Sequence, residues 1–105
     1  MSTFDDRETA FENKFAHDEE MKFKAEARRN KLLGLWASEL LGKTDEDADT
    51  YAKEVVLSDF EEAGHEDVVR KVAGDLGDLA DADTIRGKMD ELLRVAKDQL
   101  LKEAD

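Results

Sequence analysis

Apolar residues recur at spacings of three and four along most of this chain, with polar residues between them. This spacing matches the 3.6-residue period of an α-helix, and no stretch alternates apolar and polar residues as a half-buried strand does. Proline is absent, and the helix-favouring residues Ala, Leu, Glu and Lys fill the periodic stretches. The sequence therefore predicts an all-α protein.

Glycines and polar capping residues divide the chain beyond its first 17 residues into four expected helices. The first begins near Asp18 and ends at Leu41, because Gly42 supplies a stop. The second is expected to follow a hydroxyl cap at Thr44 and to reach about Glu62.

The other two expected helices occupy the C-terminal half. The third is short, begins after Glu66 and is stopped by Gly74 or Gly77. The last is capped by Asp81 or Asp83.

Each expected helix has one apolar face. The first helix has Met21, Ala25, Leu32, Trp36 and Leu40 on this face, with Leu33 at the margin, and the second has Ala48, Ala52, Val55, Val56 and Phe60, with Tyr51 at the edge. The third has Val68, Val69, Val72, Ala73 and Leu76. The last has Ile85, Met89, Leu92, Leu93, Ala96 and Leu100. Such helices with short connections pack most economically as antiparallel neighbours around one core. We therefore expect residues 18–105 to form a four-helix bundle.

The first 17 residues have a different pattern. Phe4, Phe11 and Phe15 fall in one narrow sector of a helix, with little apolar support. Burying three phenylalanines is worth roughly 5–9 kcal/mol, whereas ordering each backbone costs about 1–2 kcal/mol. We therefore expect residues 1–17 to be a mobile arm that becomes helical when an external apolar groove receives the phenylalanines. The alternative left open is that the stripe packs back on the chain's own bundle.

Length and charge narrow the class of protein. A chain of 105 residues forms one domain, and the absence of cysteine excludes disulfides and thiolate metal sites. With no run of about 18 apolar residues and no signal-peptide pattern, we expect a cytoplasmic protein without direct membrane insertion. The formal net charge of −12 argues against binding to nucleic acid or to an anionic bilayer.

A cluster of basic residues between Lys22 and Lys31 interrupts this acidic composition. A solvated face paired with nearby acids is the favoured interpretation, although such a cluster can also hold a phosphate or a carboxylate. With Trp36 as a stacking platform, the cluster suggests an alternative function as a weak binding module for ATP or ADP. A lone tryptophan on an apolar face more often belongs to the core, so no cofactor is expected.

Motifs for metal binding and catalysis are missing. The acidic run from Asp45 begins like an EF-hand loop but lacks its glycine and its final glutamate. His17 and His65 lie in no zinc or nucleophile motif, so we expect no metal site and no catalytic residue. His17 follows the arm and precedes Asp18, and a carboxylate favours the charged imidazole, so His17 is a candidate pH-sensitive hinge.

Three segments carry a resemblance to a known family. They read FDDRETAFENKFAHDEE, FKAEARRNKLLGLWASELLG and YAKEVVLSDFEEAGHEDVVRKV. These strings, which span roughly residues 1–73, resemble the alphaproteobacterial zeta subunit family that associates with the F-type ATP synthase. Lysine is frequent in that family where Thr9 stands here, on the side of the helix away from the phenylalanine stripe.

The resemblance implies a non-enzymatic inhibitor of ATP hydrolysis by the catalytic head of the synthase. It implies that the N-terminal arm enters an interface between alpha and beta subunits near the gamma subunit, and that the protein is peripheral at the inner membrane through the synthase. The apolar anchors would be Phe4, Phe11 and Phe15; the polar residues along the groove would be Asp5, Asp6, Arg7, Glu8, Glu12 and Lys14. A monomer is expected. An adaptor without inhibitory action is the remaining alternative.

Overall fold

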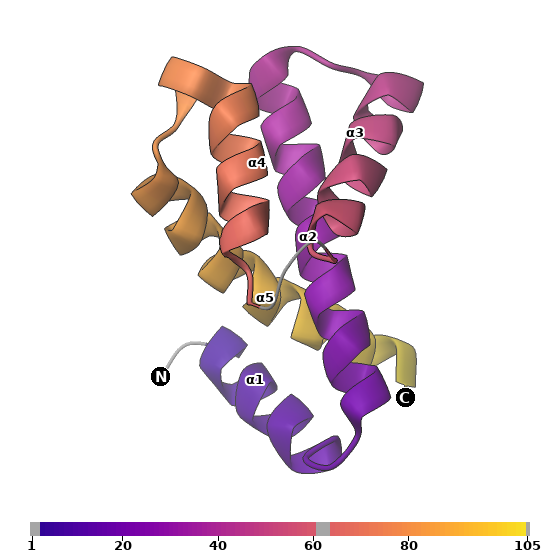
Figure 1. Ribbon diagram of the computed structural model, residues 1–105. Helices are drawn as coiled ribbons and strands as arrows, with labels where there is room; N and C mark the ends of the chain where they lie inside the picture. Colours follow the sequence, from indigo (N-terminus) through magenta and orange to yellow (C-terminus); the bar gives the residue numbers. More distant parts are fainter. Residues whose placement is uncertain (1–2, 61–63, 105) are drawn as a thin grey trace.

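The computed structural model describes residues 3–60 and 64–104. This part of the chain is all-helical, as predicted, with five α-helices and one 3-10 turn. Their bounds are α1 Thr3–Lys14, α2 Glu19–Leu41, α3 Asp45–Ser58, α4 Glu66–Leu76, η1 Gly77–Leu79 and α5 Ala82–Ala104. The expected division into a four-helix bundle and a mobile arm is not confirmed, because α1 is a helix packed against α5 (Figure 1).

Local capping explains most of the helix ends. Asp18 accepts a hydrogen bond from Met21 N at 3.1 Å and begins α2, and Gly42 ends it with a left-handed φ of 77°. Asp81, rather than Asp83, accepts from Thr84 N at 2.8 Å at the start of α5. Gly77, rather than Gly74, ends α4.

The start and end of α3 differ in detail from expectation. Thr44 is the N-cap residue, but its hydroxyl makes no capping bond, and its carbonyl accepts from Asp47 N at 3.1 Å. The helix ends at Ser58, and the expected end at Glu62 lies outside the described residues.

The main core lies between α2, α3, α4 and α5. Its buried residues are Leu33, Ala37, Tyr51, Val55, Val68, Val69, Val72, Leu76, Ile85 and Met89, with Trp36 and Leu92 among the partly buried side chains packed on them. The apolar faces predicted for α4 and for the first half of α5 are confirmed.

The face predicted for α2 is confirmed at Met21, Ala25 and Trp36 but is wrong at Leu33 and Leu40. Leu33, expected at the margin, is fully buried, whereas Leu40 is 40% exposed. The reason is that α2 contacts α3, α4 and α5, so its buried side is set by three neighbours rather than by its largest apolar residues. Phe60, expected in the core, is 61% exposed.

A second, smaller core lies where α1 meets the N-terminal part of α2 and the C-terminal half of α5 (Figure 1). Its buried residues are Phe11, Ala25, Leu100 and Leu101, and Phe15, Met21 and Leu93 pack against them. The C-terminal turns of α5 extend past the main core, so they offer an apolar surface that α1 covers.

Candidate partner-binding site

Phe11 is the residue that seats α1 on the rest of the chain. Its side chain is 1% exposed and packs with Ala25 of α2 and with Leu100 and Leu101 of α5. Full burial of a phenylalanine is worth about 2–3 kcal/mol. For Phe11 and Phe15, the alternative in which the phenylalanine stripe packs back on its own chain is therefore the arrangement of this structure.

Phe15 extends the same apolar contact into the turn after α1. Its ring centroid is 4.9 Å from that of Phe11, with the planes tilted by 56°. Phe15 N donates to Phe11 O at 2.9 Å, which continues the helical hydrogen bonding by one step. Lys14 Nζ lies 5.6 Å from the centroid of the Phe15 ring, so its charge covers this edge of the apolar surface.

Polar contacts flank the apolar one. Lys97 of α5 is paired with Glu12 and lies 4.0 Å from Glu8 Oε2, while Arg94 Nε lies 3.8 Å from the same Glu8 oxygen. Two acids of α1 thus face two cations of α5. Such pairs at a surface are each worth up to about 1 kcal/mol.

The packing under α1 is incomplete. A hollow of about 180 Å³ opens between α1, α2 and α5, and its lining includes Phe11, Lys22, Leu93 and Lys97. Among the described residues, the smaller core has four buried side chains and the main core has ten. Less apolar burial therefore holds α1 in place than holds α2, α3, α4 and α5 together.

The remaining expected site residues are only partly visible. Phe4, Asp5, Asp6 and Arg7 belong to the helical backbone of α1, but their side chains lie outside the described part of the chain. Their roles stay predictions.

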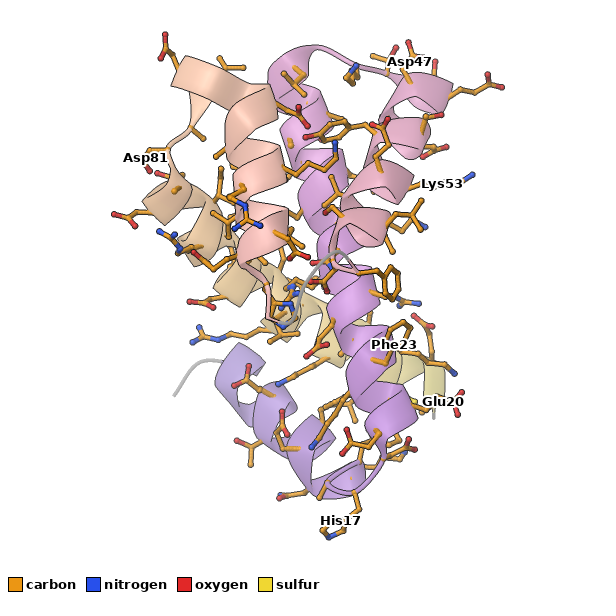
Figure 2. The ribbon with its side chains drawn as sticks, viewed as in Figure 1. His17, Glu20, Phe23, Asp47, Lys53 and Asp81 are labelled. Atoms are coloured by element: carbon orange, nitrogen blue, oxygen red, sulfur yellow. The ribbon has the colours of Figure 1, made fainter. Side chains whose placement is uncertain are left out.

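The connection between α1 and α2 is a short turn. Asp18 bonds to Met21 N, and His17 is exposed and points outward from the turn (Figure 2). The carboxylate expected to hold the imidazole thus caps α2 instead. The pH-sensitive hinge at His17 stays a prediction.

A buried polar cluster that the sequence did not reveal ties α2 to the end of α3 and the start of α4. Arg29 Nη2 lies 3.0 Å from His65 Nδ1, and Asn30 donates to Asp59 Oδ2 at 3.0 Å. Burial lowers the pKa of the Arg29 guanidinium, against the opposing effect of the Asp59 carboxylate. In the sequence, the signal for this cluster was the presence of Arg29 and Asn30 on the buried side of α2. That signal can be used only when the buried side of the helix is known.

The nucleotide alternative gains no support from the surroundings of Trp36. Its ring packs on the main core, and Lys88 Nζ lies 5.8 Å from its centroid. Lys22 and Lys24 pair with Glu19 and Glu20 of the same helix, as expected for a solvated face. Among the side chains that the structure describes, those of residues 8–60 and 64–104, no group of three or more His, Asp or Glu suits a metal ion.

The comparisons with known proteins decide the family. The family described as ATPase inhibitor subunit zeta matches residues 1–99. This chain belongs to that family. The match extends beyond the strings at residues 1–73 and includes most of α5.

One solved structure is similar to this zeta-family chain in both sequence and fold. It is a solution NMR structure with 59% sequence identity and a TM-score of 0.74, and the match covers 79% of this chain and 98% of that chain. No curated protein matches.

Membership of the zeta family makes this protein a regulatory inhibitor subunit associated with ATP synthase, and not an enzyme. Among the helices that the structure describes, none combines the length and the apolar character needed to cross a membrane.

Proposed function

We propose that this protein inhibits ATP hydrolysis by inserting its N-terminal helix, within residues 1–17, between alpha and beta subunits of the F-type synthase head, next to the gamma subunit. The family assignment supports the inhibitory role. The helical state of residues 3–14 supports the use of this segment as a rod. A location at the inner membrane through the synthase, as a monomeric subunit, follows from the same proposal.

The observation that carries the proposal is that α1 is an appendage. The residues of the main core and those packed on it all lie between 33 and 92, so none comes from α1. Only residues 15–18 join α1 to α2. Detachment of α1 therefore exposes the smaller core but leaves the main core packed.

Nine side chains between residues 4 and 15 have a role in this proposal. The apolar side of α1 is the surface that enters the interface, and the acids and bases around it set the register against the subunits. The anchors are Phe4, Phe11 and Phe15, and the polar residues are Asp5, Asp6, Arg7, Glu8, Glu12 and Lys14.

Phe11 is buried in the free protein and would be buried again in the complex. Its burial consequently contributes to the affinity for the head only by the difference in burial free energy between the site in the complex and the site on α5. A helix that fills a catalytic interface stops the rotary cycle because the next step must close that space, and preference for one state is sufficient. The main core then serves as a body that keeps α1 at high local concentration.

The test is titration of the protein into a soluble cognate ATPase head, read as hydrolysis rate. We expect inhibition by the full chain, and loss of inhibition on deletion of residues 2–17 with the α2–α5 core still folded. An adaptor would instead bind the head without slowing hydrolysis, and unchanged inhibition by the deletion variant would exclude the role of α1.

The finer variant is Phe11→Ala with Phe15→Ala, which removes two anchors and leaves the main core packed. Leu79→Ala is the matched control, because Leu79 is an exposed leucine on η1, outside both cores. We expect the double variant to inhibit more weakly and the control to inhibit as the wild type does.

His17→Ala, followed by circular dichroism across pH, tests the proposed pH-sensitive hinge at His17. Unchanged pH dependence of the helix content in this variant would contradict the hinge.

A further inference from the structure

Three of the exposed large apolar side chains gather on one face, formed by α2 and the end of α3. Phe23 on α2 is 52% exposed, and Leu57 and Phe60 are 64% and 61% exposed. The rings of Phe23 and Phe60 have centroids 6.0 Å apart, so they form one apolar surface across two elements. Figure 2 shows Phe23 projecting from α2 toward the solvent.

The surface between these side chains is hollowed. Two neighbouring hollows of about 520 Å³ and 530 Å³ share Lys31 and Val56 in their linings. Along α2, the stretch from Phe23 to Lys31 is about 12 Å long, or roughly two helical turns. We call this surface, formed by Phe23, Ala27, Val56, Leu57 and Phe60, the α2–α3 groove.

The edges of the α2–α3 groove are basic, although the chain as a whole carries a net charge of −12. The two hollows are lined by four cations, Lys24, Arg28, Lys31 and Lys53, and by two carboxylates, Asp49 and Glu103. Glu103 is engaged by Arg28. Within the described part of the chain, Lys31 and Lys53 form no ion pair and share their hollow with one carboxylate, Asp49, so the lining has an excess of positive charge.

An apolar floor with basic edges is complementary to a helix that has apolar residues at spacings of three and four and acids on either side. We propose that the α2–α3 groove binds an acidic amphipathic helix of a partner protein. Phe23 and Phe60 are the apolar contacts, and Lys31 and Lys53 select the acidic flanks. This goes beyond the role of α1, since α1 packs on α5 around Phe11.

The probe is a pair of synthetic peptides of about 15 residues, long enough for marginal helicity. Both carry leucine at spacings of three and four; one has glutamate at the flanking positions and the other has lysine. Each is titrated into the isotope-labelled full chain and followed by amide chemical shifts. We expect the glutamate peptide to shift the amides of Phe23, Lys31, Leu57 and Phe60, and the lysine peptide to bind far more weakly.

Two sets of variants sharpen the test. Phe23→Ala with Phe60→Ala should weaken binding of the glutamate peptide by about tenfold or more. Lys31→Glu with Lys53→Glu should reverse the preference toward the lysine peptide. Leu79→Ala is the matched apolar control, and the dispersed amide spectrum of each variant shows that it is folded.

Four outcomes would overturn the proposal. They are the absence of shifts in the groove with the glutamate peptide, an equal response to both peptides, sedimentation as a dimer that Phe23→Ala with Phe60→Ala converts to monomer, and binding to phosphatidylglycerol vesicles that the same variant abolishes. The third assigns the face to a second copy and the fourth to a lipid surface. No measurement here uses an ATPase, so this proposal can fail while the inhibitory role of α1 stands.

Discussion

Lys97 Nζ of α5 lies 5.8 Å from the centroid of the Phe11 ring of α1. The same ammonium group is paired with Glu12 and lies 4.0 Å from Glu8. One side chain therefore covers the buried aromatic anchor and faces two acids beside it. In the proposed function α1 leaves its contact with α5 to inhibit the synthase, and Lys97 opposes this release.

We predict that Lys97→Met loosens α1. Methionine keeps an apolar stem of similar length but removes the charge, at a cost to α1 docking of about 1 kcal/mol. Hydrogen exchange at the amides of α1 should become about fivefold faster, with exchange in α3 unchanged. Inhibition of the ATPase should occur at lower protein concentration, because less free energy opposes release.

Lys102→Met is the control for that substitution. Among the described residues, Lys102 pairs with Asp98 of its own helix, at 3.1 Å, and its side chain is exposed. Equal exchange rates in α1 for the wild type and Lys97→Met would show that Lys97 does not hold α1.

Phe11→Ala should detach α1 without unfolding the main core. Removal of a buried phenylalanine costs about 3–5 kcal/mol when the structure cannot give way, but here the loss is confined to the smaller core. We expect lower helix content by circular dichroism. The fluorescence of Trp36, the single tryptophan, should report a nearly unchanged melting temperature because it packs on the main core. A large fall in that temperature would show that the two cores unfold together.

Gly34→Ala should destabilise the fold by about 1–3 kcal/mol. A Cβ at Gly34 would lie 2.6 Å from Ala52 Cα, and this backbone atom cannot move unless α2 and α3 separate. The gain in helix propensity, up to about 1 kcal/mol, does not offset that cost. Urea unfolding followed through Trp36 measures the change.

Gly87→Ala is the matched control for Gly34. Gly87 lies within α5, and a Cβ there meets nothing within 4 Å. The same substitution should therefore stabilise the protein by up to about 1 kcal/mol. Destabilisation at both glycines would contradict the assignment of the effect to the contact with Ala52.

Tyr51 should make the fold sensitive to alkaline pH. Its hydroxyl donates to Asp75 Oδ2 at 2.8 Å, and burial, with this carboxylate, raises the pKa of Tyr51 well above its usual value. Because the folded-state pKa is the higher one, the stability that Tyr51 contributes is fully present below about pH 10, the usual tyrosine pKa. It is lost as pH rises beyond that value.

The measurement is direct because Tyr51 is the single tyrosine. Absorbance near 295 nm should show the phenolate forming only together with unfolding. Tyr51→Phe should remove the part of the alkaline destabilisation that begins near pH 10. Ionisation of Tyr51 at its usual pKa in the folded protein would contradict the predicted shift.

The division of the chain into helices was predictable because its signals are local. The capping residues act on backbone groups within about four residues of themselves, so their effect can be predicted without knowledge of the fold. They are Asp18, Gly42, Gly77 and Asp81. Family membership was likewise carried by strings of sequence. For α2 the spacing favoured the side of Leu32 and Leu40 and put Leu33 at its margin, because two adjacent sides of this helix carry leucines.

Tertiary packing decided the rest. Leu33 is buried and Leu40 is exposed because α3, α4 and α5 surround α2 from particular directions. Phe11 is buried because the last turns of α5 bring Leu100 and Leu101 beside it, although more than 80 residues separate them in the chain. The sequence by itself determined the bounds of α2 and narrowed the end of α4 and the start of α5 to two residues each, since capping is a short-range interaction. Only the three-dimensional arrangement determined which side chains have a partner, because burial depends on residues far away in the chain.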